Sequence, residues 1–176
     1  MFDSVLIVAF GGPQGLDEVR PFLERVLHGR RVTAERIDEV AHHYELFNGV
    51  SPITELTRRQ ADGLQQRLAT AGYPLPVYVG MRNWHPLLAD TLKEMHDGGA
   101  HHAIGFIAAA HHCYSSCQQY RENVQDARTA LRSAAGADIE ITYTQSWFDQ
   151  PLFAEANAVH VQIGRASCRE RVCQYV

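Results

Sequence analysis

Short apolar runs alternate along the chain with longer segments of helical periodicity. The runs cover residues 4–10, 76–80, 103–110 and 139–144, and a loop with glycine or polar residues follows each of them. Runs of this length, rich in β-branched and aromatic side chains, are typical of strands buried in a parallel sheet. The pattern therefore predicts a strand in each run.

The segments between and after these runs carry apolar residues at the spacing of a helix face. Thr33 and Ser51 precede two of them, and their hydroxyls suit a helix N-cap, with Pro52 then at the first helical position. Strand and helix alternate four times, which predicts an α/β fold, a doubly wound parallel sheet with helices on both faces. The predicted helices cover residues 16–27, 33–44, 52–71, 86–95, 115–135 and 151–161.

Ligands of doubly wound sheets bind in the loops beyond the carboxyl ends of the strands. In this sequence those loops are AFGGPQG, GMRNWHP, AAHHCYSSCQQY and TQSWFDQP. They contain both tryptophans and most of the distinctive polar residues. We therefore expect the functional site at this edge of the predicted sheet.

Composition narrows the classes of function. The 176-residue chain is 45% hydrophobic and 20% charged, with a formal net charge of −4. This balance is typical of a soluble globular domain and does not favour nucleic-acid binding, which needs a basic surface. No segment approaches the roughly 20 apolar residues of a membrane-spanning helix. Four cysteines without the spacing of a disulfide framework favour a reducing compartment, so we expect a cytoplasmic location.

Two familiar kinds of site are not favoured by the motifs. Gly11, Gly12 and Gly15 follow a predicted strand, but their spacing matches neither the dinucleotide-binding fingerprint nor the P-loop. The stretch HHCYSSC at residues 111–117 offers ligand types that suit zinc, but a closed zinc site needs four converging groups, usually in two spaced pairs. We therefore predict neither a nucleotide site nor a local zinc site.

Motifs from one end of the chain to the other follow the order and spacing of one enzyme family. They are LIVAFGGP at residues 6–13, HYELFNGVSPITELT at 43–57, YVGMRNWHPLLADTL at 78–92, HHCYSSCQQYREN at 111–123 and QSWFDQP at 145–151. Together they resemble the ferrochelatases, which insert ferrous iron into a porphyrin. The resemblance covers about residues 3–160 and is strongest to the compact bacterial branch, which includes coproporphyrin ferrochelatases.

The resemblance implies two similar doubly wound domains with the porphyrin between them, and this chain resembles the first. We expect that domain at residues 1–162, incomplete at its C-terminal end. We interpret residues 163–176, IGRASCRERVCQYV, as a non-native tail, and a short basic tail of natural origin is the alternative. The family's metal-handling histidine lies in a Ser-Ala-His motif that we expect beyond Gln162, and its partner glutamate in the second domain. The resemblance therefore assigns no catalytic residue to this chain.

The resemblance also implies which residues bind the porphyrin. Ser51 and Tyr120 are the first candidates for contact, followed by Phe10 and Tyr44. Ser51 can equally serve as the helix cap described above, and both uses are compatible. A core position on an amphipathic helix is the alternative for Tyr44.

Arg82, Trp84 and His85 are candidates for the wall of the cleft. The alternatives are a structural ion pair for Arg82 and a simple hydrogen bond in the cleft wall for His85. Some ferrochelatases carry a [2Fe-2S] cluster with one cysteine from this region and three from the C-terminus, and Cys117 stands at the matching position. Since the three partners are absent from this sequence, we expect such a cluster only in a full-length protein.

The segment from Leu23 to Ile37 is expected to form the lip of the cleft. Coproporphyrin III has four propionates where protoporphyrin IX has two, and guanidinium groups bind carboxylates through charge-assisted hydrogen bonds. We therefore expect coproporphyrin III and Fe²⁺ as substrates, unless the arginines only form a solvated helix face paired with acidic neighbours. The arginines of this segment are Arg25, Arg30, Arg31 and Arg36.

A different class of function stays open at this point. The same fold would suit a tetrapyrrole- or metal-binding module, or a cobalt-type chelatase relative, in which His111 and His112 would be metal ligands. The long match through FNGVSPITE and GMRNWHP favours iron insertion.

Overall fold

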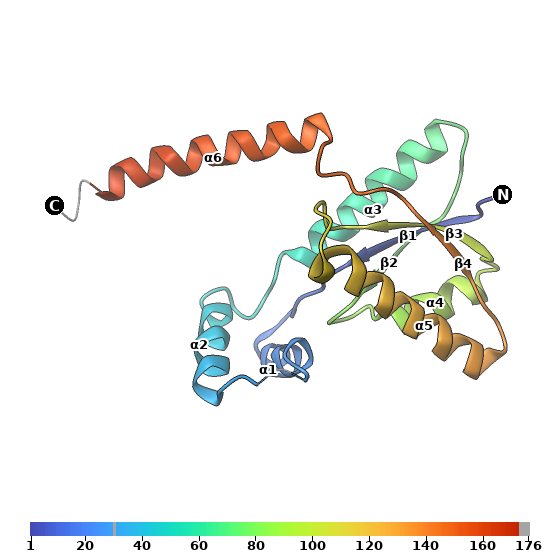
Figure 1. The fold of residues 1–176 in the computed structure, drawn as a ribbon, viewed down its shortest axis with the longest axis horizontal. Helices are drawn as coiled ribbons and strands as arrows, with labels where there is room; N and C mark the ends of the chain where they lie inside the picture. The colour runs from blue at the N-terminus through green and yellow to red at the C-terminus, as the bar shows by residue number, and fades with distance from the viewer. Residues whose placement is uncertain (30, 173–176) are drawn as a thin grey trace.

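The predicted parallel sheet is present in the computed structural model, which describes residues 1–29 and 31–172, with residues 116 and 163–172 described by their backbone (Figure 1). The strands pair in the order β2-β1-β3-β4, and every pairing is parallel. Each strand overlaps its predicted run. The strands are β1 (Ser4–Ala9), β2 (Val77–Met81), β3 (His102–Ile107) and β4 (Glu140–Tyr143).

Helices cover both faces of the sheet, as predicted. Figure 1 shows α3 on one face, α4 and α5 on the other, and α6 extending away from the sheet. This arrangement confirms the doubly wound α/β fold. The helices are α1 (Leu16–Val26), α2 (Ala34–Glu45), α3 (Ile53–Thr70), α4 (Leu88–Asp97), α5 (Gln119–Ala135) and α6 (Pro151–Val172), and a π-helical turn, η1 (Tyr114–Gln118), precedes α5.

Strand β1 forms the centre of the sheet. Val5 pairs with Val77 of β2 on one side and with Ile104 of β3 on the other. All residues of β1 are buried, and Leu6 and Val8 belong to the main core beneath α4 and α5. A strand that is paired along both edges and covered on both faces needs a continuous apolar run, which explains the sequence of β1.

The starts of α3, α4 and α5 differ from prediction, and α5 begins at Gln119 because the π-helical turn η1 covers the first predicted residues. Helix α3 begins at Ile53 with Pro52 at the N-cap, one residue later than predicted, although Ser51 Oγ accepts a hydrogen bond from Ile53 N at 3.5 Å. Helix α4 begins two residues later than predicted, because the Pro86 carbonyl accepts a hydrogen bond from Met81 N at 2.7 Å and so belongs to the loop. The predicted Thr33 cap of α2 is confirmed.

Helix α6 is longer than predicted. Its backbone stays helical to Val172, whereas the sequence pattern ended the helix at residue 161. The interpretation of residues 163–176 as a tail stays a prediction, and residues 173–176 lie outside the described part of the chain. Within the described ranges, no helix is both long and apolar enough to cross a membrane.

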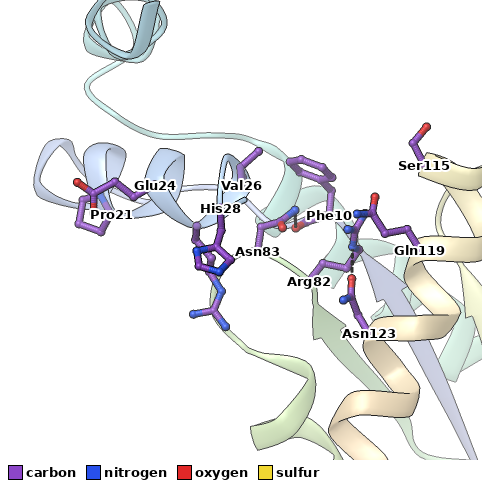
Figure 2. Close-up of a pocket in the computed structure, with 11 residues that line it drawn as sticks. Phe10, Pro21, Glu24, Val26, His28, Arg82, Asn83, Ser115, Gln119 and Asn123 are labelled. Atoms are coloured by element: carbon purple, nitrogen blue, oxygen red, sulfur yellow. Dashed lines mark hydrogen bonds between the residues drawn. The ribbon is translucent and has the colours of Figure 1, made fainter. Parts of the chain in front are cut away.

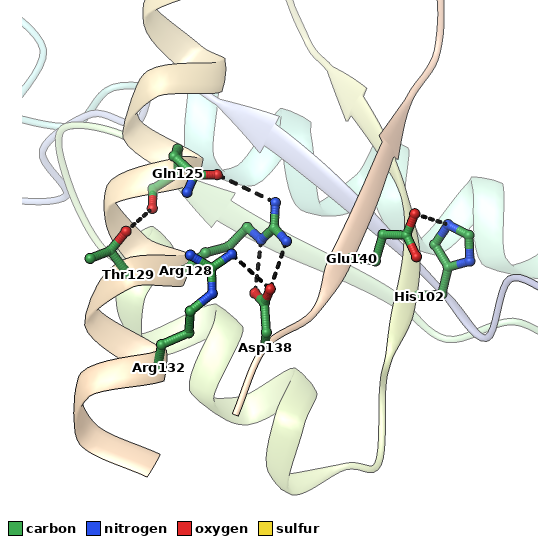
Figure 3. A network of polar contacts seen from close by, with 7 residues as sticks. All are labelled: His102, Gln125, Arg128, Thr129, Arg132, Asp138 and Glu140. Atoms are coloured by element: carbon green, nitrogen blue, oxygen red, sulfur yellow. Dashed lines mark hydrogen bonds and ion pairs between the residues drawn. The ribbon is translucent and has the colours of Figure 1, made fainter. Parts of the chain in front are cut away.

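The two edges of the sheet differ in character. At the carboxyl ends of the strands, a hollow lies between α1 and α5 (Figure 2). At the amino ends, polar side chains join α5 to the start of β4 (Figure 3). There Asp138 accepts hydrogen bonds from Arg128 at 2.8 and 2.9 Å and from Arg132 at 2.7 Å. The hydrogen bonds from Arg128 above all hold the pKa of Asp138 at about 2, below its ordinary value of 3.8.

The close contact between the β1–α1 loop and α3 generates a stability prediction. A Cβ atom at Gly12 would lie 2.5 Å from Ser51 Cβ, so we expect Gly12→Ala to lower the free energy of unfolding by about 1–3 kcal/mol in urea denaturation. Gly63→Ala is the control, because a Cβ atom there meets nothing within 4 Å inside α3. That variant should be more stable than wild type by about 0.5–1 kcal/mol. Equal changes in the free energy of unfolding at both positions would show that the close approach of Ser51 to Gly12 does not limit the side chain there.

The Asp138 ion pairs generate a pH prediction. Because the pKa of Asp138 is lower in the folded than in the unfolded state, its stabilisation is present above about pH 4 and is lost as the pH falls towards 2. The side chain is 37% exposed, so we expect Asp138→Asn to lower the free energy of unfolding by only about 1 kcal/mol at pH 7. Denaturation curves at pH 7, 4 and 2 should show this difference disappearing. If the difference in the free energy of unfolding between wild type and Asp138→Asn stays the same at all three pH values, it does not come from the Asp138 ion pairs.

Candidate functional site

An open cavity of about 800 Å³ lies at the carboxyl-end edge of the sheet (Figure 2). Residues from α1 form one side, residues from η1 and α5 form the other, and the residues that follow β1 and β2 lie between them. The cavity is lined by Phe10, Pro21, Glu24, Arg25, Val26, His28, Arg82, Asn83, Ser115, Gln119 and Asn123. The edge of the sheet that the sequence pointed to therefore does carry a cavity with mixed apolar and polar walls.

Backbone hydrogen bonds hold the two central loops of the cavity together. The Phe10 carbonyl accepts hydrogen bonds from both the backbone N and the side-chain Nδ2 of Asn83, each at 3.1 Å. Arg82 N donates to the Ala9 carbonyl at 3.0 Å. These contacts continue the pairing of β1 and β2 beyond the strands, so Phe10 and Arg82 have fixed positions relative to each other.

The Arg82 side chain is half-buried and held on two sides. Its Nε donates to Asn123 Oδ1 at 2.6 Å, and its guanidinium carbon lies 4.5 Å from the centre of the Tyr120 ring. Within the described part of the chain, no carboxylate lies within ion-pair distance of Arg82. The ion pair considered as an alternative for Arg82 is therefore not seen; an amide and an aromatic ring take its place.

Tyr120 lies beneath Arg82, in the main core. It is 5% exposed, and its burial raises the pKa of its hydroxyl, an effect that the nearby Arg82 charge partly offsets. Its ring faces the guanidinium of Arg82 and is not part of the cavity lining. The predicted contact between Tyr120 and a porphyrin stays a prediction.

Aromatic rings join α1, α2 and both central loops beside the cavity. Phe22 of α1 lies in edge-to-face contact with Tyr44, Trp84 and Phe10, at centroid distances of 5.9, 6.1 and 6.4 Å. Tyr44 thus has the core environment considered as its alternative, and burial raises the pKa of its hydroxyl. The Trp84 Nε1 donates to a carboxylate oxygen of Glu18 on α1. Trp84 therefore anchors the β2–α4 loop to α1.

Ser51 and His85 lie outside the cavity lining. Ser51 N donates to the Pro13 carbonyl at 2.8 Å, and the Ser51 carbonyl accepts from Gln14 Nε2 at 3.1 Å, which fixes α3 to the β1–α1 loop. His85 is exposed, with its ring 5.5 Å from that of Trp84. The structure thus brings Phe10 and Arg82 together in the cavity, while the other predicted residues surround or support it.

Cys117 is a buried residue of η1. It is 7% exposed, belongs to the main core, and its Sγ donates to the Cys113 carbonyl at 3.5 Å. Among the side chains that the structure describes, no group of three or more His, Cys, Asp or Glu is placed to hold a metal ion. His111 packs against Phe148 and Phe153, with centroid distances of 6.4 and 6.1 Å. We therefore derive no chemistry from a [2Fe-2S] cluster, which stays a prediction.

The arginines of the predicted lip have different environments. Arg25 lines the cavity, whereas Arg36 pairs with Glu39 at 2.5 Å on the exposed surface of α2. Arg31 is exposed, and Arg30 lies outside the described residues. The solvated-face alternative therefore holds for Arg36, and Arg25 is the lip arginine at the cavity.

Asn83, Gln119 and Asn123 are cavity residues that the motif analysis missed. Gln119 and Asn123 stand four residues apart at the start of α5, so their side chains share one face of the helix. A polar pair at this spacing, in the first turns of the helix that follows the third strand, is the signal that could have identified them.

Comparisons with known proteins agree with the motifs. The ferrochelatase family model matches residues 3–173. A coproporphyrin III ferrochelatase from Mycobacteroides abscessus is 44% identical over 169 residues, which cover 96% of this chain and 49% of the relative. A ferrochelatase from Rhodopirellula baltica is 43% identical over 176 residues, which cover 97% of this chain and 49% of the relative. A coproporphyrin III ferrochelatase from Mycolicibacterium paratuberculosis is 47% identical over 154 residues, which cover 88% of this chain and 44% of the relative.

These matches confirm the resemblance drawn from the motifs. The chain spans about half the length of the curated relatives it matches. The family match extends over nearly all of the sequence and includes the four-stranded parallel sheet and every loop of the cavity. The chain belongs to the ferrochelatase family.

Proposed function

We propose that this chain is the porphyrin-binding part of an enzyme that inserts Fe²⁺ into coproporphyrin III in haem biosynthesis. The observation that carries the proposal is the cavity of about 800 Å³, whose lining combines the Phe10 ring with the basic side chains of Arg25 and Arg82. A porphyrin is a flat apolar macrocycle with carboxylates at its rim, so it needs apolar surface together with cations. Relatives named coproporphyrin III ferrochelatases support the choice of substrate.

The residues of this chain would bind and orient the porphyrin. Insertion requires Fe²⁺ to lose water and two pyrrole N–H groups to lose protons, tasks that suit a neutral imidazole and a carboxylate. By resemblance those groups are expected beyond Gln162 and in a second domain of the full-length protein. Phe10 is our first candidate for contact with the macrocycle, because it lines the cavity. Contacts from Ser51, Tyr44 and Tyr120 are proposed on the family resemblance alone.

Arg25 supports the preference for coproporphyrin III over protoporphyrin IX. It lies in an exposed position on α1, at the rim of the cavity. An exposed cation attracts carboxylates over a range set by the Debye length, about 8–10 Å at ordinary ionic strength. Its contribution should therefore grow with the number of propionates on the substrate and should weaken at high salt.

The first test separates binding from insertion. We expect the 176-residue chain to quench the fluorescence of coproporphyrin III on binding, and to form no iron coproporphyrin when ferrous iron is added without oxygen. The full-length protein should both bind and insert. Absence of porphyrin binding in both proteins would overturn the proposed function. Binding by the full-length protein without insertion would favour the tetrapyrrole-binding module, and turnover by the short chain would place metal handling within it.

The second test concerns Arg25. We expect Arg25→Ala to weaken coproporphyrin III binding by about two- to fivefold at low salt, the range of an exposed ion pair, with a smaller effect on protoporphyrin IX. Arg36→Ala is the matched control, because Arg36 pairs with Glu39 and does not line the cavity. Fluorescence titrations at 50 and 500 mM salt provide the measurement. If Arg25→Ala and Arg36→Ala lower the affinity equally, or if Arg25→Ala lowers the affinity for both porphyrins equally, the proposed role of Arg25 is wrong.

A further inference from the structure

We propose that the Arg82 guanidinium binds one carboxylate of the porphyrin, and that Asn123 and Tyr120 are positioning residues that aim it. This inference rests on the proposed function, because it names the group of the porphyrin that this part of the cavity recognises. It also gives Tyr120 an indirect role, since Tyr120 would act through Arg82.

Arg82 stands where two hollows meet. The larger cavity holds Phe10 and the α1 residues, and a second hollow of about 310 Å³ lies between the start of α4 and α5. Arg25, Arg82 and Asn123 line both. Figure 2 shows Arg82 beside Phe10, with its side chain directed to Asn123 on α5. A group bound at Arg82 would therefore be accessible from the large cavity.

The guanidinium group is held before any ligand arrives. The backbone of Arg82 is tied to the end of β1, its Nε donates to Asn123 Oδ1 at 2.6 Å, and the Tyr120 ring supports the guanidinium plane from 4.5 Å. Asn123 and Tyr120 both belong to α5, so one helix supplies both supports. A side chain fixed in this way loses little conformational entropy when it binds.

Arg82 differs from the arginines that serve the fold. Arg20, Arg36, Arg128 and Arg132 each pair with a carboxylate. Arg82 is half-buried, and among the described residues none supplies it with a counter-charge. Arginine stays protonated in proteins, and a partly desolvated cation without a counter-charge is costly. An incoming carboxylate would supply that charge, and the planar guanidinium fork matches its geometry.

The neighbouring side chains favour a carboxylate attached to an apolar ring. Phe10 lines the same cavity as Arg82 and offers an aromatic surface beside the cation. The α1 side of the cavity carries both Glu24 and Arg25, whereas on the α5 side Asp126 lines the smaller hollow and not the large cavity. A propionate on a macrocycle that lies against Phe10 fits this arrangement.

Arg121 provides an internal control. Its guanidinium carbon also lies 4.5 Å from the centre of a tyrosine ring, that of Tyr143, and it also belongs to α5. Arg121 lines a separate cleft of only about 10 Å³ and not the large cavity. Arg121→Gln therefore removes a similar cation–π contact without touching the proposed carboxylate site.

The experiment compares coproporphyrin III with its tetramethyl ester, which has no carboxylates. In fluorescence titrations of the 176-residue chain, we expect Arg82→Gln to weaken binding of the acid by roughly 10- to 100-fold, as for a lost hydrogen-bonded charge pair, and to leave ester binding unchanged. Arg82→Lys should restore part of the loss, because it keeps the charge without the fork. Arg121→Gln should leave both affinities at the wild-type level.

Asn123→Ala tests the positioning role. We expect about a threefold loss of affinity for the acid when Arg82 is present, and no further loss in the Arg82→Gln background, as for residues that act through one another. Equal weakening of acid and ester by Arg82→Gln, or additive losses in the double variant, would overturn this inference and leave the proposed function standing. If neither the wild-type 176-residue chain nor the full-length protein binds either porphyrin, both proposals fail together.

Discussion

The central position of β1 is the constraint on which the site depends. Its parallel pairing with β2 and β3 continues past the strand ends, where the carbonyls of Val8, Ala9 and Phe10 accept hydrogen bonds from Ala108, Arg82 and Asn83. Backbone pairing of this kind leaves little freedom to slide, because a shift of one residue would turn every side chain to the opposite face. The register of one buried strand therefore determines which residues of two neighbouring loops meet in the cavity. Phe22 then packs α1 against those loops through its contacts with Phe10 and Trp84.

A strongly shifted pKa does not by itself identify which edge of the sheet is functional. The pKa of Asp138 is lowered to about 2, yet Asp138 lies at the amino ends of the strands, where two arginines already satisfy it. Perturbed ionisable groups are common at functional sites, but ion pairs that hold a loop perturb pKa values in the same way. Arg82 shows the opposite situation, since an amide and a ring orient it and no described carboxylate neutralises it. For a site that binds an anion, the unneutralised cation is the more informative feature.

Periodicity was sufficient to predict the fold, and the strand-end rule was sufficient to predict the edge of the sheet where the large cavity lies. The positions of Phe10 and Arg82 at this edge could be predicted because they lie at the ends of two strands, whereas the choice of Phe10 as a contact came from the family resemblance. The role of Asn123 and the burial of Tyr120 could not, because they depend on how α5 is rotated against the sheet, which packing of the whole core decides. The sequence also predicted a helix start at Pro86, because proline is favoured at the first helical position. In the structure the Pro86 carbonyl accepts a hydrogen bond from Met81 N, and Pro86 stays in the loop. The sequence therefore could not predict which side chains of different helices, strands and loops contact each other.

The cavity combines two kinds of cation whose physical effects differ. Arg25 is exposed, so its attraction for carboxylates is long-ranged, weak and screened by salt. Arg82 is half-buried and fixed, so its interaction is short-ranged, directional and much less sensitive to salt. An exposed cation responds to the number of propionates on a porphyrin, whereas a fixed guanidinium responds to where one propionate lies. If the chain binds a porphyrin as proposed, discrimination between porphyrins would be controlled from α1 and orientation of the macrocycle from the end of β2, so the two properties would be separable.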